Sequence, residues 1–81
     1  MYLMNVYVLR SLKDNRFYVG MSADIEKRIQ THNSGNVKST KGYRPWELIH
    51  QESFPDRITA RKREKYLKSG YGKQWLKEKY N

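Results

Sequence analysis

The chain has 81 residues, and its 17 Lys and Arg against eight Asp and Glu give a formal net charge of +9. So short a chain predicts one domain, residues 1–81, with a small core. It has no cysteine, which excludes a disulfide framework and a cysteine-based zinc site, so a reducing cytoplasm is the expected location. Its apolar segments are too short for a signal peptide or a membrane span.

The positive charge is concentrated toward the end of the sequence. From Asp56 onward there are nine Lys and Arg against three Asp and Glu. A charge run of this kind is typical of a solvated helical surface, and it also suits a polyanionic partner. The whole chain also contains seven tyrosines and two tryptophans, which favours nucleic acid, because aromatic rings can stack on bases.

Two short apolar segments at the start of the chain predict a β-hairpin. Residues 4–10 and 16–20 are the predicted strands, and the polar residues 11–15 supply the turn. If Leu9 faces Arg16, then Tyr7 lies directly opposite Tyr18, with both hydroxyls on the same face of the sheet. Four other tyrosines are expected only to pack against the structure: Tyr2, Tyr66, Tyr71 and Tyr80.

The first predicted helix follows the hairpin. Ser22 can cap it, Asp24 and Glu26 suit its first turn, and Gly35 suits its C-terminal end. Residues 33–43 predict a mobile polar loop, and residues 46–52 predict a third strand.

Pro55 and Asp56 open a second helix that runs to about Ser69, where Gly70 and Gly72 interrupt the pattern. Residues 73–80 predict a short last helix. The order is therefore β-β-α-β-α-α, an α/β fold whose first two strands are antiparallel.

Two rows of residues lie side by side on the first helix. Ile25 and Ile29 form an apolar row, and Arg28 and His32, also four apart, form the next row at the edge of the core. Taken alone, Arg28 could extend into solvent and His32 could hydrogen-bond a helix end.

The second helix carries a carboxylate on an apolar stripe. Glu64 shares one face with Ala60 and Leu67. A buried, unpaired carboxylate costs several kcal/mol, so Glu64 either pairs with a cationic side chain such as Lys68 or holds a metal cation. One carboxylate is enough for Mg²⁺, which takes other ligands from water and phosphate, whereas the chain lacks the clustered acids of a two-metal site.

The motifs around the two tyrosines resemble those of a known family. Asn5-Val6-Tyr7 and Tyr18-Val19-Gly20 resemble the two half-motifs of the GIY-YIG nuclease family, and Arg28, His32 and Glu64 follow in family order. The chain is most similar to small single-domain bacterial members, which also resemble the N-terminal incision domain of the excision-repair nuclease. The resemblance implies a central three-stranded antiparallel sheet flanked by helices.

The same resemblance implies a metal-dependent DNA endonuclease of DNA repair or processing. Tyr7 would orient or deprotonate the attacking water, provided that cationic neighbours lower its pKa, and Tyr18 would position the phosphate. Arg28 would bind the phosphoryl oxygens, and His32 would assist as an acid or a base. Glu64 would hold a single Mg²⁺ or Mn²⁺ beside the leaving 3′ oxygen.

DNA is the expected partner, bound through its backbone or its shape rather than a long sequence. Five cationic residues are candidate DNA contacts: Lys38, Lys41, Arg44, Arg61 and Arg63. A homodimer could cut both strands.

The sequence departs from the family pattern in two places. Asn5 stands where the family name has Gly, and an Asn common near the C-terminal end of catalytic members has no match, unless Gln74 replaces it. These departures favour an alternative, a nucleic-acid-binding module with weak or no activity. A structural or partner-binding protein whose tyrosines merely pack is the third reading.

Overall fold

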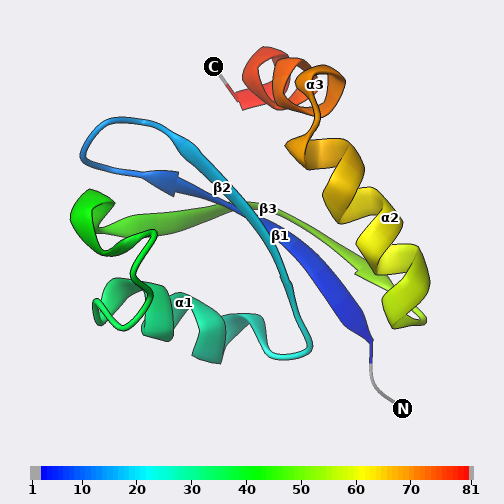
Figure 1. Ribbon diagram of the computed structural model, residues 1–81, viewed down its shortest axis with the longest axis horizontal. Coiled ribbons are helices and arrows are strands. Elements are labelled where there is room, and N and C mark those ends of the chain that lie inside the picture. Colours follow the sequence, from blue (N-terminus) through cyan, green and yellow to red (C-terminus); the bar gives the residue numbers. More distant parts are fainter. Residues whose placement is uncertain (1–2, 81) are drawn as a thin grey trace.

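The fold is known from a computed structural model, which describes residues 3–80. In chain order its elements are β1 (Met4–Ser11), β2 (Phe17–Ser22), α1 (Ile25–Asn33), the 3-10 turn η1 (Lys41–Tyr43), β3 (Trp46–Phe54), α2 (Arg57–Lys68) and α3 (Gly70–Tyr80). The strands form one antiparallel sheet in the order β2-β1-β3, flanked by helices (Figure 1). The predicted α/β class and element order are confirmed.

Strand β1 is buried on both faces of the sheet. Val6 and Val8 point into a core shared with α2 and α3, and Tyr7 and Leu9 point into a second cluster that includes Ile residues of α1. All four are at most 1% exposed. This explains the uninterrupted apolar run in the sequence, because a strand covered on both sides needs no polar alternation. Figure 1 shows α1 on one side of the sheet and α2 with α3 on the other.

The predicted hairpin register is wrong by two residues. Leu9 pairs with Tyr18 and Tyr7 pairs with Gly20. The turn is tighter than expected, because Ser11 N–H donates to the Arg16 carbonyl at 2.9 Å and so continues the ladder to the end of β1. A shift of two residues keeps every side chain on its face, so both tyrosines still share one face of the sheet.

The element boundaries also differ from the predictions at several ends. Asp24, not Ser22, is the N-cap of α1, and its carboxylate accepts the Lys27 N–H at 3.1 Å. Gly35 lies just past the end of α1 with φ +86°, as its predicted terminal position requires. Strand β3 runs two residues further than predicted, to Phe54. Asp56 caps α2 as expected.

Glycines do not interrupt the last helix, which begins at Gly70 instead of residue 73. Gly72 lies against the end of α2, where an added Cβ would fall 2.1 Å from the carbonyl oxygen of Tyr66 and 2.5 Å from Cα of Leu67. Gly70 has open space around it. The close approach at Gly72 lets α3 fold back and bury Leu76, which is 0% exposed.

Substitution of Gly72 by Ala is expected to destabilise the protein, because the new methyl group overlaps the backbone of α2. Overpacking of this kind costs about 1–3 kcal/mol. Gly70→Ala is the matched control and is expected to be neutral or slightly stabilising, since the position is open and helical. Urea denaturation of both variants checks this. Equal stability of the two variants would contradict the role given to Gly72.

The tyrosines expected to pack divide into different cases. Tyr80 packs against the core of α2 and α3, whereas Tyr66 is 42% and Tyr71 83% exposed, so packing does not account for Tyr71. Tyr2 lies outside the described residues. The Tyr80 hydroxyl and the carboxylate of Glu52 hydrogen-bond the two ring nitrogens of His50, which ties α3 to β3.

Candidate active site

Tyr7 stands at the centre of the site, on β1 and 1% exposed. Its ring crosses over Gly20 of the neighbouring strand: an added Cβ at Gly20 would fall 2.5 Å from the Tyr7 hydroxyl oxygen. The observed pairing of Tyr7 with Gly20 therefore has a steric reason. Only a residue without a side chain at this point of β2 lets the Tyr7 hydroxyl reach the edge of the sheet.

A short hydrogen-bonded chain joins the Tyr7 hydroxyl to the loop after α1. The Tyr7 hydroxyl lies 3.1 Å from Nε2 of His32, and Nδ1 of His32 lies 2.9 Å from Oγ1 of Thr40. His32 is 0% and Thr40 1% exposed. Both hydroxyls can donate or accept, so either tautomer of the ring satisfies all three groups. This chain, the Tyr7–His32–Thr40 relay, can move a proton away from Tyr7.

Tyr18 and Arg28 complete the group around Tyr7. The ring centroid of Tyr18 is 4.7 Å from that of His32 and 6.4 Å from that of Tyr7. Hydrogen bonding to Tyr7 raises the pKa of Arg28, so its guanidinium stays positively charged. Arg28 and His32, which are four residues apart on α1, thus both lie beside the two tyrosines, as their spacing predicted.

The pKa of Tyr7 is raised above its ordinary value of 10.0, which corrects the expectation that cationic neighbours would lower it. Burial of the phenol is the largest cause, and the hydrogen bond from Arg28 only opposes it in part. A neutral Tyr7 can therefore act as a base only if it passes its own proton to an acceptor. His32 is the acceptor within reach.

His32 is neutral at pH 7. Burial and then the charge of Arg28 lower its pKa from 6.5 to about 4. A neutral imidazole keeps a lone pair on one ring nitrogen, which suits it to accept the proton of Tyr7. A phosphate bound at the site would favour the protonated ring through its negative charge.

This pKa predicts a dependence of stability on pH. The unfolded chain takes up a proton at His32 near pH 6.5, and the folded protein does so only near pH 4. The free energy of unfolding is therefore full above pH 6.5 and falls as the pH drops from 6.5 to 4, by up to about 3 kcal/mol. Urea titrations across this range should show the fall, and His32→Gln should flatten it. An unchanged slope in that variant would contradict a buried neutral His32.

Glu64 lies on α2 with its apolar neighbours, as predicted, and is 7% exposed. Its carboxylate oxygens are 3.4 Å from Nζ of Lys68 and 3.6 Å from Nε of Arg61. Both distances exceed the 2.7–2.9 Å of a charge-assisted hydrogen bond. The carboxylate is close enough to Tyr7 for its charge to raise the pKa of that residue. The predicted ion pair exists, and it is loose.

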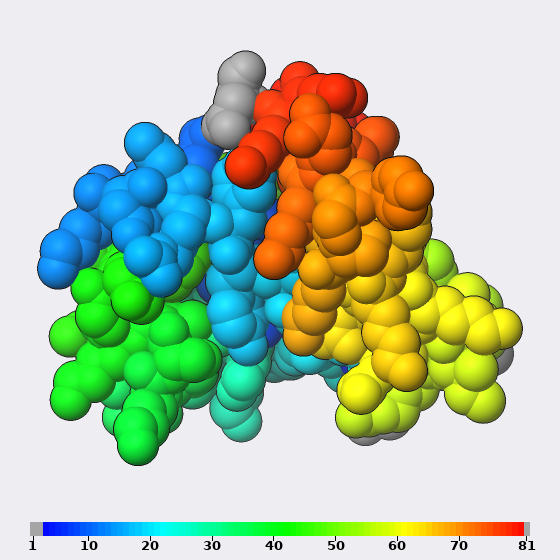
Figure 2. All heavy atoms as spheres, turned by 45° about the horizontal axis from the view of Figure 1, so that its top comes forward, coloured from blue at the N-terminus to red at the C-terminus, as the bar shows by residue number. Residues whose placement is uncertain are grey.

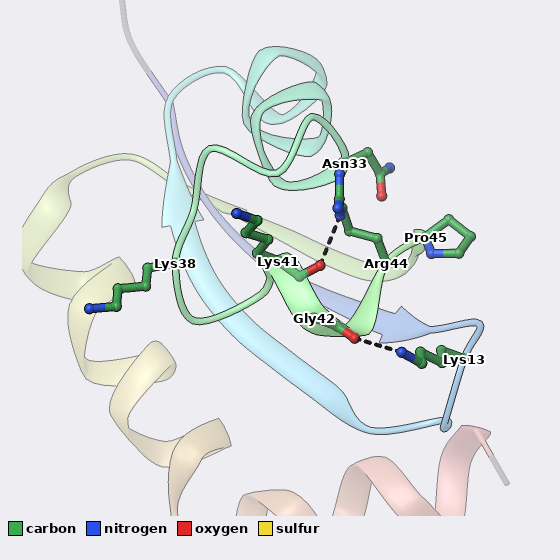
Figure 3. A pocket seen from close by; sticks show the side chains of 7 residues that line it. All are labelled: Lys13, Asn33, Lys38, Lys41, Gly42, Arg44 and Pro45. Atoms are coloured by element: carbon green, nitrogen blue, oxygen red, sulfur yellow. Dashed lines mark hydrogen bonds between the residues drawn. The ribbon is translucent and has the colours of Figure 1, made fainter.

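A pocket beside the relay is lined by cationic side chains. Its lining residues are Lys13, Asn33, Lys38, Lys41, Gly42, Arg44 and Pro45, with no carboxylate among them (Figure 3). Lys13 donates to the Gly42 carbonyl at 3.2 Å and Arg44 to the Lys41 carbonyl at 2.8 Å, which fixes both side chains. The pocket shares its loop with Thr40. We call it the basic pocket.

The five residues predicted to contact DNA lie in different parts of the structure. Lys38, Lys41 and Arg44 all line the basic pocket. Arg61 is on α2 with a side chain 59% exposed, next to Glu64. Arg63 forms a two-point ion pair with Glu52 at 2.9 and 3.1 Å, and its guanidinium lies over the ring of Trp75.

Two groups of the site escaped the sequence reasoning. Thr40 and Lys13 reach the site only because the loop folds back over the hairpin turn, and no local pattern indicates this.

The two departures from the family pattern have structural contacts of their own. Asn5, which replaces the family's Gly, links the outer strands: its side-chain N–H donates to the Ser22 carbonyl at 3.2 Å, and its side-chain oxygen accepts from the Ser53 hydroxyl at 2.6 Å. Gln74 is exposed and donates to Glu78.

Sequence comparison identifies the class of protein to which this fold and site correspond. The GIY-YIG catalytic domain matches residues 3–81, and the chain belongs to this family, a family of nucleases. The antiparallel sheet and the helices that flank it are therefore those of a GIY-YIG domain.

Within the family the chain is similar to UPF0213 proteins. It is 41% identical to UPF0213 protein SH2523 of Staphylococcus haemolyticus over 73 residues, 89% of this chain and 88% of the relative. It is 42% identical to UPF0213 protein YazA of Bacillus subtilis over 79 residues, 93% of this chain and 79% of the relative. The solution structure of UPF0213 protein BH0048 from Bacillus halodurans superposes with a TM-score of 0.57 at 32% identity, covering 96% and 85% of the two chains.

None of the helices in residues 3–80 combines the length and the apolar character that crossing a membrane would require.

Proposed function

We propose that this protein is a metal-dependent DNA endonuclease that hydrolyses phosphodiester bonds, directed by DNA structure or backbone, in DNA repair or processing. The observation that carries the proposal is the buried relay from Tyr7 through His32 to Thr40, with Tyr18 and Arg28 beside it. A tyrosine that serves only in packing would not require a hydrogen bond to a histidine whose other ring nitrogen is itself bonded to a buried hydroxyl.

The chain's own residues account for the proton and charge transfers of the reaction. Tyr7 takes a proton from the attacking water while its own proton passes to Nε2 of His32. Arg28 binds the phosphoryl oxygens, where negative charge increases as water attacks phosphorus and the bond to the 3′ oxygen breaks. Tyr18 orients the phosphate. The 3′ oxygen leaves with the electrons of the broken bond and takes a proton from solvent, while His32 releases the proton it received, so the products are a 3′ hydroxyl and a 5′ phosphate.

Glu64 is the residue that would hold the metal ion. Its carboxylate is nearly buried, and its contacts to Lys68 and Arg61 are long, so a divalent cation could replace them. Mg²⁺ needs only one protein carboxylate here, because water and phosphate oxygens can supply its other ligands. When bound, Mg²⁺ or Mn²⁺ would neutralise the charge developing on the leaving oxygen.

DNA binding is proposed for the basic pocket and for Arg61. Lys38, Lys41 and Arg44 line one pocket without a carboxylate among its lining residues, which suits a backbone phosphate at a distance from the scissile one. Arg63 is already paired with Glu52, so we assign it to holding α2 against β3.

The second candidate function is nucleic-acid binding without cleavage. The ion pairs of Glu64 with Lys68 and Arg61 favour it, since they satisfy the carboxylate without a metal.

A homodimer is proposed for the endonuclease alone, because a second copy of the chain would let it cut both DNA strands.

The test is incubation of the purified chain with supercoiled plasmid and Mg²⁺. Nicked or linear product is expected, and EDTA should abolish it. Binding that weakens with salt but yields no cut plasmid with either Mg²⁺ or Mn²⁺ would overturn the endonuclease and leave the binding module.

A further inference from the structure

A second pocket lies on the other side of the candidate active site, between β2 and α3. Its volume is about 440 Å³, and it is lined by Asn15, Arg16, Phe17, Tyr18, Val19, Lys68, Lys73, Leu76 and Lys77. Ligand pockets span about 300–1,000 Å³, so this one has room for a nucleotide. In Figure 2 the light-blue β2 and the orange α3 border each other on the visible face. We call this the β2–α3 pocket.

The floor of the β2–α3 pocket is apolar. Val19 is 7% and Leu76 0% exposed, and Phe17 packs on the same core while remaining partly exposed. An aromatic ring at the wall of an apolar cavity offers a surface on which a nucleobase can stack.

One wall of the pocket is an open strand edge. β2 is at the end of the sheet, and within residues 3–80 it pairs only with β1. Since the Arg16 carbonyl accepts the Ser11 N–H, residue 16 points its peptide groups toward β1, and the alternation of an antiparallel strand turns those of Phe17 and Val19 outward. The pocket thus presents peptide N–H and C=O groups that can hydrogen-bond the polar edge of a base.

The rim of the pocket is cationic. Lys73 and Lys77 are one turn apart on α3, both are exposed, and no ion pair involves either of them in the part of the chain that the structure describes. Lys68 connects the rim to the candidate active site through its contact with Glu64. Phosphates on both sides of an inserted base would meet this rim, whereas the apolar floor excludes them.

We propose that the β2–α3 pocket receives one unpaired nucleobase next to the scissile phosphate, so that the enzyme prefers DNA with an unstacked or single-stranded nucleotide at the cleavage site. The inference rests on the proposed function in taking DNA as the ligand. A paired base cannot enter without leaving its duplex, so the pocket would discriminate by DNA structure and not by sequence.

The experiment measures binding in EDTA, which prevents cleavage, with two fluorescein-labelled duplexes that differ only in one extra, unpaired adenine at the centre. The bulged duplex is expected to bind at least about fivefold more tightly than the fully paired one, as stacking of one base allows. Phe17→Leu, which keeps the core apolar, should remove most of this ratio. Lys73→Ala with Lys77→Ala should lower it too, without touching the core.

Lys62→Ala with Lys65→Ala is the matched control: it removes the same charge from exposed positions of α2 outside the pocket, so it should weaken both duplexes alike and leave the ratio unchanged. A ratio near one in the wild-type chain, or a ratio that neither pocket variant lowers, overturns the proposal. If plasmid is cleaved but the binding ratio is near one, the pocket proposal is refuted and the proposed nuclease is retained. If the bulged duplex binds more tightly as expected but no plasmid is cleaved, the pocket proposal is retained and the nuclease is refuted.

Discussion

Replacement of Tyr7 by Phe is expected to lower the rate of plasmid nicking by about 10²–10⁴-fold, the range that general acid–base catalysis contributes. The variant keeps the ring that packs over Gly20 and loses only the hydroxyl bonded to His32. Loss of one buried hydrogen bond should cost only about 1–2 kcal/mol of stability, so the protein should remain folded. Single-turnover nicking at saturating protein and Mg²⁺ measures the effect.

The chain offers a matched control for this prediction. Tyr80 also donates or accepts a hydrogen bond with a histidine, His50, but on the opposite face of the sheet. Tyr80→Phe removes the same group from a similar pair, and nicking should stay within about twofold of wild type. If both variants lose activity in proportion to their lost stability, Tyr7 is a packing residue.

Replacement of Glu64 by Gln is expected to reduce nicking by about 10³-fold, since a metal ligand that stabilises several kcal/mol of transition-state charge would be lost. Gln has the same shape and lacks the charge, so Arg61 and Lys68 lose only two long ion pairs. Pairs with one partner more than half exposed contribute little. The melting temperature should therefore change little, while the Mg²⁺ concentration needed for half-maximal nicking should rise.

Glu78→Gln is the control substitution. Glu78 is exposed on α3, and among the candidate site residues its carboxylate hydrogen-bonds Gln74 alone. Its nicking rate should match that of wild type at every Mg²⁺ concentration. A large drop in the melting temperature of Glu64→Gln, together with full nicking activity, would make Glu64 a structural ion pair and remove the metal assignment.

The sequence alone determined the order of the elements, the faces of the helices and most of the residues that gather around Tyr7. Local patterns are sufficient for these: an apolar run predicts a buried strand, i and i+4 spacing places Arg28 beside His32, and a carboxylate between Ala60 and Leu67 must lie near the core. The motifs around Tyr7 and Tyr18 added the family, which the comparison confirmed.

Only the tertiary structure decided how these residues meet. The hairpin register depended on one turn hydrogen bond, and Tyr7 opposes Gly20 because its ring needs the space that glycine leaves. The raised pKa of Tyr7 reflects its burial, which no local pattern measures. Thr40 meets His32 because the loop after α1 folds back toward that helix, and Gly72 lies inside α3 because the backbone of α2 packs closely against it. Such contacts depend on three-dimensional distance, and sequence spacing encodes distance only within a single helix or strand.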